Sequence, residues 1–189
     1  MTADPSRARD LRLLDAIDAF AREPFARSVW RVAREGRDPL AGAPSISRWC
    51  DGTFDVLYTS LERGGALAEI FALLSIQPVF PSKVRFLVHR LKVRAGSAIR
   101  FADLATLAKL GVDVTRYRDR DYSRTQPIAD AAYFLGFDGL IAPSARWECA
   151  NAVLFTERIP PGKIQIAKSE QIPIDWDTWR KSMRKSTRR

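Results

Sequence analysis

Residues 54–74 read FDVLYTSLERGGALAEIFALL, and this stretch places a strand pattern directly before a helix pattern. The run from Phe54 to Thr59 is short and rich in apolar and β-branched residues, which predicts a strand. The pair Gly64-Gly65 follows, and the apolar run that extends to Leu74 predicts a helix. A strand and a helix so close together indicate a fold that mixes both kinds of element.

The residues before this stretch predict three further segments. Apolar residues recur at helical spacing from Leu11 to Phe20, and Pro24 ends this predicted helix. A short strand is expected at Val29–Ala33. Residues 34–53 are rich in Gly, Pro, Ser and Asp and predict a long loop, and loops of this length are often functional.

The residues after Leu74 predict helices and strands in no regular βαβ order. We therefore expect an α+β fold, a single domain built around a mixed, mostly antiparallel sheet. Neither a GxGxxG nor a Walker motif occurs, so neither standard nucleotide cradle is expected. The expected elements are strands at 84–93, 139–142 and 151–156, a helix at 102–110, a helix capped by Thr125 and ending at Gly136, and a last short helix with Trp176, Trp179 and Met183 on one face.

Length and composition limit the class of protein. The chain has 189 residues, which fits one domain with a substantial core. It has no run of about 18 apolar residues, so no membrane helix is expected. The first ten residues, MTADPSRARD, lack the apolar centre of a signal peptide, and we expect a cytoplasmic protein without membrane contact.

The few cysteines and histidines argue against several kinds of site. Cys50 and Cys149 do not form a CxxC pair and are expected to be reduced structural thiols. His89 is the only histidine, which excludes any site that needs two. It lies in a predicted strand, where an exposed side chain is expected. A single histidine also lowers the expectation of Ser-His-Asp or Cys-His catalysis.

The formal net charge of +9 raises the question of nucleic-acid binding. Six basic residues and no acidic ones lie within Arg180 to Arg189. Without those six, 25 basic residues face 22 acidic ones, a net charge of +3. The excess charge is therefore mostly a property of the C-terminal tail, and such tails are usually solvated.

Glu69 is the only charged residue between Gly64 and Leu74. Its neighbours three and four positions away along a helix are small or apolar, so its carboxylate does not belong to a charged stripe. A lone buried carboxylate costs roughly several kcal/mol unless it is paired or hydrogen-bonded. The residues alone leave two interpretations open: a structural cation partner, or a place in a pocket.

Three further residues have both a structural and a functional interpretation. Arg31 interrupts the apolar strand at Val29–Ala33, and it either points outward or clamps a phosphate or carboxylate with its planar guanidinium. Tyr58 lies at a strand end, where both core and site residues are common. Ser144 lies just beyond a short strand and is either a turn hydroxyl or a site residue.

These residues occur in an order that resembles the RES family, which is named for its Arg, Glu and Ser. The resemblance covers Val29 to Phe155 and rests on the order and spacing of many short blocks. The chain departs from the family at 46–50, where ISRWC replaces the usual Gly-Gly-Arg-Trp-Asn run. The matching blocks are Trp30–Val32, Pro39–Gly42, Ser47–Trp49, Val56–Ser60, Ala66–Ile70, Arg124–Asp130, Gly136–Arg146 and Asn151–Phe155.

The resemblance implies a toxin related in fold to ADP-ribosyltransferase toxins. It implies NAD⁺ as substrate, with cleavage of the nicotinamide–ribose bond by phosphorolysis or hydrolysis, inorganic phosphate as a candidate co-substrate, and no metal or other cofactor. It also implies a cognate antitoxin with a helix-turn-helix part, through which any contact with DNA is indirect. The implied division is an N-terminal helical extension at 1–28, the RES domain at 29–160, and a C-terminal extension at 161–189.

The resemblance also assigns roles to individual residues. Glu69 would stabilise the positive charge that develops on the ribose, as carboxylates do in glycosidases. Arg31 would act with Glu69 as a catalytic residue by holding pyrophosphate or inorganic phosphate, and Arg48 would bind whichever of these two groups Arg31 does not. The remaining candidates are Tyr58 for stacking on nicotinamide or ribose, Ser144 for ribose or phosphate, and Asn151 for an amide or ribose contact.

Two alternatives to this activity remain. The first is a mono-ADP-ribosyltransferase that modifies a protein. The second is a basic nucleic-acid-binding protein that uses the C-terminal tail for salt-sensitive binding.

Overall fold

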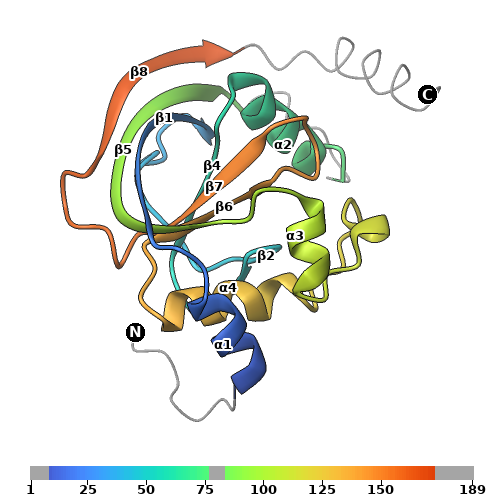
Figure 1. Ribbon diagram of the computed structural model, residues 1–189. Coiled ribbons are helices and arrows are strands. Elements are labelled where there is room, and N and C mark those ends of the chain that lie inside the picture. The colour runs from blue at the N-terminus through green and yellow to red at the C-terminus, as the bar shows by residue number, and fades with distance from the viewer. Residues whose placement is uncertain (1–8, 77–83, 173–189) are drawn as a thin grey trace.

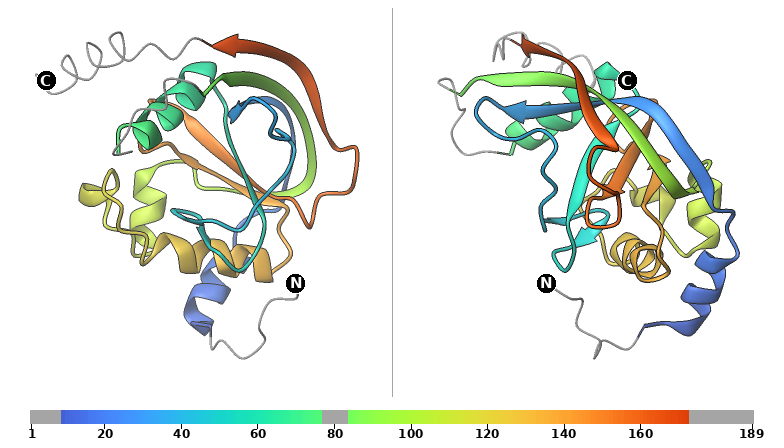
Figure 2. Two further views of the ribbon diagram at one scale, coloured as in Figure 1. Left: turned by 180° about the vertical axis from the view of Figure 1, so that it is seen from behind. Right: turned by 90° about the vertical axis from the view of Figure 1, so that its left-hand side faces the viewer.

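The computed structural model describes residues 9–76 and 84–172, in which a curved sheet has helices packed at both of its ends (Figure 1). The helix α2, which carries Glu69, lies at one end, and α1 and α4 lie together at the other (Figures 1 and 2). The helical elements are α1 (Leu11–Asp18), α2 (Arg63–Leu74), α3 (Leu104–Lys109), the 3-10 helix η1 (Val114–Arg116) and α4 (Thr125–Phe134).

The strands close into a five-stranded barrel. Neighbouring strands follow the order β1-β4-β7-β6-β5, and β5 pairs back onto β1. The strand β8 adds to the barrel on β5, and a small hairpin of β2 and β3 lies apart. The strands are β1 (Glu23–Arg34), β2 (Ile46–Ser47), β3 (Cys50–Asp51), β4 (Val56–Ser60), β5 (Phe86–Arg100), β6 (Gly139–Pro143), β7 (Ala150–Phe155) and β8 (Ile164–Ile172).

The pairing confirms a mixed, mostly antiparallel sheet. Only the contact between β5 and β6 is parallel among the pairings of the main sheet. The barrel closes unevenly, because β1 and β5 pair along most of their length whereas β1 and β4 share the single residue pair Trp30 and Ser60. This weak seam between β1 and β4 lies beside the candidate site described below.

Apolar side chains fill both the barrel and the spaces under the helices. One buried cluster takes side chains from all five barrel strands, which identifies it as the barrel interior; it includes Val29, Leu57, Leu91, Ile141 and Ala152. A second cluster packs α1, α3 and α4 against the other face of β4, β6 and β7. A third joins α2 to β1, β5 and β8. The helix that carries Glu69 is therefore packed against the barrel wall.

Most of the elements expected from the sequence are confirmed, with five corrections. The short strand expected at Val29–Ala33 is part of the longer β1, Glu23–Arg34. The strand expected at 84–93 continues to Arg100, and the expected loop at 34–53 contains the β2–β3 hairpin. The strand β8 was not expected. Thr125 is not a cap, because it is the first residue of α4 and Arg124 precedes it as N-cap. The expected helix with Trp176, Trp179 and Met183 lies outside the described residues, and the division into extensions and a central domain stays a prediction.

Two smaller findings concern the cysteines and the membrane. Cys50 and Cys149 are both free thiols, as expected. Among the described residues, none of the helices has the length and apolar character needed to cross a membrane.

Candidate functional site

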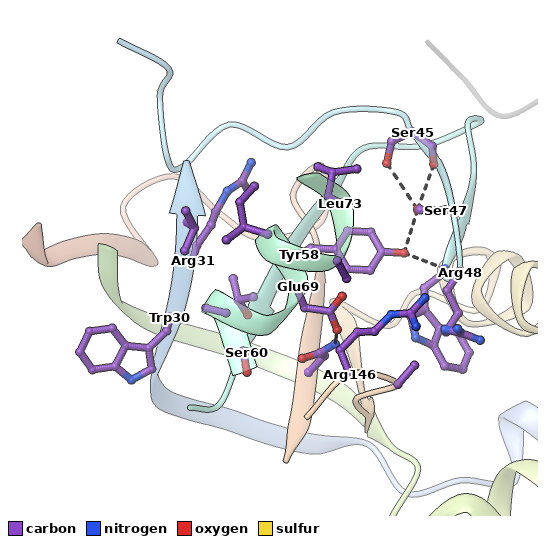
Figure 3. A pocket seen from close by; sticks show the side chains of 18 of the residues that line it. Trp30, Arg31, Ser45, Ser47, Arg48, Tyr58, Ser60, Glu69, Leu73 and Arg146 are labelled. Atoms are coloured by element: carbon purple, nitrogen blue, oxygen red, sulfur yellow. Dashed lines mark hydrogen bonds between the residues drawn. The ribbon is translucent and has the colours of Figure 1, made fainter. Parts of the chain in front are cut away.

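A pocket of about 440 Å³ lies between α2, the loop before β3 and the seam of the barrel (Figure 3). Its wall combines apolar side chains with several charged ones, the composition typical of small-molecule sites. Among the described residues, those that line it and carry charge are one carboxylate and four arginines: Glu69, Arg31, Arg48, Arg120 and Arg146.

Glu69 projects from α2 and is held by two hydrogen bonds to one oxygen. Its Oε1 accepts from the Ser144 hydroxyl at 3.0 Å and from the Asn151 side-chain amide at 2.9 Å. Ser144 is itself fixed, because its hydroxyl oxygen accepts from the backbone N–H of Arg146. Within the described chain, Glu69 has no basic side chain within salt-bridge distance. The structure therefore favours a place in a pocket for Glu69 over a structural cation partner.

The glycine pair at the start of α2 lets the helix approach the strands closely. A Cβ on Gly65 would lie 2.7 Å from the Cys149 sulfur and would also meet the Ser60 hydroxyl. A Cβ on Gly64 would lie 2.8 Å from the Trp147 ring. Larger residues at either position would push α2 outward, and Glu69 would move away from its two hydrogen-bond donors.

Tyr58 anchors the loop that carries Arg48. The Tyr58 hydroxyl accepts from the backbone N–H of Trp49 at 2.7 Å and pairs with the Ser47 hydroxyl at 2.8 Å. Gln126 of α4 adds two bonds from its amide to the backbone carbonyls of Ser47 and Cys50. Burial raises the pKa of Tyr58 above its ordinary value, so the phenol stays neutral.

Arg48 lies over two aromatic rings on the far side of the pocket from Arg31. Its guanidinium carbon is 4.4 Å from the centre of the Tyr117 ring and 5.2 Å from that of Tyr122. Its Nη2 donates to the backbone carbonyl of Asp119 at 3.0 Å. Figure 3 shows Arg31 and Arg48 on opposite sides of Glu69 and Tyr58. A ligand that spans the pocket would therefore meet a cation at each end and a carboxylate between them.

Several buried polar atoms of this site have no hydrogen-bond partner among the described residues. They include Nη1 of Arg31, Nη1 of Arg48 and Oδ1 of Asn151. Asn151 is only 8% exposed, and its amide orientation follows from the bond that its Nδ2 donates to Glu69. Buried polar groups in native proteins are usually paired, so open ones gathered around a pocket point to a polar ligand.

His89 is buried, which corrects the expectation of an exposed strand residue. It is 6% exposed and lies directly across from Arg31 on the neighbouring strand. Burial lowers the pKa of His89, and the charge of Arg31 lowers it further. The sequence of β5 does not show that His89 is buried. Its polar partner Ser169 lies on β8, a strand that the sequence does not predict.

The structure gathers most of the predicted site residues in one place. Arg31, Arg48, Tyr58, Glu69 and Asn151 all line the pocket. Ser144 does not, because it lies behind Glu69 and donates its hydroxyl hydrogen to that carboxylate.

Other residues that line the pocket were not predicted as site residues, among them Arg146, Ser47, Arg120 and Tyr122. Arg146 belongs to a block that resembles the RES family and could have been found by its position two residues after Ser144. Ser47 belongs to a second such block, and Arg120 and Tyr122 come from a segment with no clear pattern.

The charges define the chemistry that this pocket suits. Four guanidinium groups favour an anionic ligand, because each presents planar donors that match phosphate oxygens. The Glu69 carboxylate suits a group that becomes positive during reaction. In the described part of the chain, no group of three or more His, Cys, Asp or Glu side chains lies close enough to hold a metal ion.

Comparison with known proteins gives consistent matches. The RES domain family matches residues 28–177. A probable NAD(+) phosphorylase from Mycobacterium tuberculosis is 31% identical over 157 residues, which span 79% of this chain and 74% of that protein. The crystal structure of the MbcT–MbcA toxin–antitoxin complex of M. tuberculosis contains a similar chain, with a TM-score of 0.79 and 19% identity over 92% of this chain and 98% of that one. The last match shows likeness of fold.

Proposed function

This chain belongs to the RES domain family, and from this premise we propose that it is a toxin that degrades NAD⁺ by cleaving the bond between nicotinamide and ribose. The related protein of M. tuberculosis is named a probable NAD(+) phosphorylase, and the similar solved chain belongs to a toxin–antitoxin complex. The observation that carries the proposal is the Glu69 carboxylate, which two hydrogen bonds fix inside a pocket that, in the described part of the chain, also has four arginines in its wall.

Glu69 supplies the electrostatic part of the reaction. Nicotinamide leaves as a neutral molecule with the electron pair of the broken C–N bond, so the leaving group needs no proton. The ribose carbon meanwhile gains positive charge, which a fixed carboxylate stabilises. Ser144 and Asn151 hold Oε1, so the carboxylate is already in place when the charge develops. This role makes Ser144 a positioning residue that acts through Glu69.

The arginines bind the charged groups of the substrates. NAD⁺ carries two linked phosphates, and a phosphorolytic reaction requires a third, separate phosphate. Arg31 and Arg48 lie at opposite ends of the pocket with Glu69 between them, so one binds the pyrophosphate and the other binds the acceptor phosphate. Tyr58 presents its ring to the pocket and stacks on nicotinamide or ribose.

Bond formation completes the reaction. An oxygen of the acceptor attacks the ribose carbon as the C–N bond breaks. With phosphate the products are nicotinamide and ADP-ribose 1″-phosphate, and with water they are nicotinamide, ADP-ribose and a proton.

Two further expectations belong to this proposal. We propose that the barrel is related in fold to ADP-ribosyltransferase toxins, with NAD⁺ bound across the seam between β1 and β4. We also propose a cognate antitoxin with a helix-turn-helix part that neutralises the enzyme, which is supported by the toxin–antitoxin complex that contains the similar chain.

The test is consumption of NAD⁺ by the purified protein with and without inorganic phosphate, with the products identified by mass. We expect nicotinamide in both reactions and ADP-ribose 1″-phosphate when phosphate is present. Labelled NAD⁺ added to a cell lysate separates the alternative of a mono-ADP-ribosyltransferase, which would leave label on protein. Intact NAD⁺ under all of these conditions would contradict the proposal.

A further inference from the structure

Two buried nitrogen atoms without a hydrogen-bond partner belong to residues on neighbouring strands at one end of the pocket. Arg31 of β1 and His89 of β5 are directly opposite each other in the antiparallel register. Side chains of such a pair leave the same face of the sheet, with Cβ atoms roughly 5 Å apart. Within the described chain, Arg31 Nη1 and His89 Nε2 have no hydrogen-bond partner. Buried polar groups in native proteins are usually paired, so two unpaired nitrogens this close together indicate a binding place for a polar ligand.

The pocket reaches Arg31 of this pair, beside the weak seam of the barrel. Arg31 and His89 lie on the same strand faces as Val29 and Leu91, which pack in the barrel interior. Arg31 also lines the pocket. Because the described strands β1 and β4 are joined only at Trp30 and Ser60, a ligand bound at Arg31 would face the interior side of β1 beyond that point.

His89 adds a hydrogen-bond donor without adding charge. Its Nδ1 lies 2.7 Å from the Ser169 hydroxyl oxygen. When that hydroxyl donates to Nδ1, the ring carries its proton on Nε2, and this nitrogen becomes a donor. Burial and the charge of Arg31 both lower the pKa of His89, so the imidazole is neutral around pH 7.

Arg31 keeps its charge available for a ligand. In the described chain, it forms no ion pair within 4.0 Å, and the Asp38 carboxylate acts on it only from a distance. A guanidinium beside a neutral imidazole N–H offers two kinds of donor and one positive charge. That combination suits a tetrahedral oxyanion such as phosphate.

We propose that Arg31 and His89 together bind one phosphate group, with Ser169 holding the imidazole in the donating tautomer. The subsite rests on the proposed function only for the identity of its ligand, which is either inorganic phosphate as the acceptor or the pyrophosphate of the dinucleotide. His89 is then a phosphate-binding residue supplied by the barrel interior.

The single histidine allows a direct test. Because His89 is the only histidine in the chain, its imidazole gives one nuclear magnetic resonance signal for each ring position, and no assignment is needed. The full-length protein is titrated with inorganic phosphate alone and, separately, with ADP-ribose alone, at constant ionic strength set with chloride. We expect a saturable change in the His89 signals in at least one titration. A response to phosphate alone identifies the acceptor subsite, and a response to ADP-ribose only identifies the pyrophosphate subsite.

Variants separate this subsite from a general effect of charge. Arg31→Gln is expected to weaken the response at least tenfold, and Arg31→Lys provides a second variant if the first does not fold. Ser169→Ala is expected to weaken it as well, because the ring loses its support. The matched control is Arg94→Gln, which removes an exposed cation from β5, the strand that carries His89, and is expected to leave the response unchanged.

Two results would overturn the subsite: no saturable change with either ligand, or an undiminished change in folded Arg31→Gln. NAD⁺ consumption is measured on the same samples. Phosphate binding at His89 without any NAD⁺ consumption would contradict the proposed function but keep the subsite. Normal consumption without a response of His89 would overturn the subsite alone.

Discussion

The carboxylate in the middle of the pocket and the arginines at its two ends differ in how far the protein satisfies their polar atoms. Glu69 Oε1 accepts two hydrogen bonds from side chains that the fold itself supplies. Arg31 and Arg48 each keep a buried nitrogen without a partner in the described chain. A group that stabilises a transition state works best when it is fixed in advance, whereas a group that binds a ligand must remain available. Under the proposed function, this difference matches catalysis at the centre and ligand binding at the ends.

Replacing the central carboxylate should have the largest effect. We expect Glu69→Gln to lower the turnover of NAD⁺ by about a hundredfold or more, because one fixed electrostatic contact contributes about 3–4 kcal/mol to the transition state. The measurement is kcat for nicotinamide release. Glu62→Gln is the matched control, since it changes an exposed carboxylate just before the same helix. Near-normal turnover in a folded Glu69→Gln protein would remove Glu69 from the mechanism.

Moving the carboxylate instead of removing it should have the next largest effect. In Gly65→Ala the new Cβ meets Ser60 and Cys149, so α2 shifts and Glu69 loses its alignment with Ser144 and Asn151. Misplacement by about 1 Å can cost a hundredfold in rate, and we expect a loss of about ten- to a hundredfold in kcat.

The control for this substitution is Gly96→Ala, in which the added Cβ makes only an ordinary contact at 3.6 Å with the Asp138 carboxylate. Equal kcat values for Gly65→Ala and Gly96→Ala would show that the close approach of α2 does not position Glu69.

Replacing an arginine at one end should affect binding more than turnover. Lysine keeps the charge of Arg48 but cannot lie flat over the Tyr117 and Tyr122 rings or present a planar fork. We expect Arg48→Lys to raise KM for NAD⁺ about tenfold, equivalent to about 1.4 kcal/mol, with kcat little changed. Arg118→Lys, at an exposed position nearby, should leave both constants unchanged. A fall in kcat with constant KM in Arg48→Lys would contradict the proposal that Arg48 binds the ligand and Glu69 carries the catalysis.

The sequence predicts the central carboxylate better than the surroundings of the arginines. Glu69 is conspicuous because it interrupts an apolar helix, and local spacing is enough to find it. The partners of Arg31 and Arg48 come from distant parts of the chain, such as His89 on β5 and Tyr117 after η1. Local periodicity carries no information on which strands become neighbours.

The same reason explains what was missed in the fold. The strand segments of the barrel could be predicted from short patterns, but its closure depends on the pairing of β1 with β5, more than fifty residues apart. The strand β8 alternates weakly, since most of its residues are exposed, and so it gave no apolar pattern to detect.

The smallest expected effect comes from the residue that connects the centre to one end. Tyr58 lines the pocket with its ring, while its hydroxyl holds the backbone of Trp49 next to Arg48. In Tyr58→Phe the Trp49 N–H loses its acceptor, which costs about 1–3 kcal/mol of stability. We expect KM for NAD⁺ to rise only a few fold. The free energy of unfolding, measured on the same variant, should fall.

Tyr58→Leu removes the aromatic ring as well as the hydroxyl. The difference in KM between the two variants therefore measures the contribution of ring stacking apart from that of the hydroxyl bond to Trp49. Equal KM values for both variants would mean that Tyr58 serves the site only through the loop it holds, and the stacking role would be withdrawn.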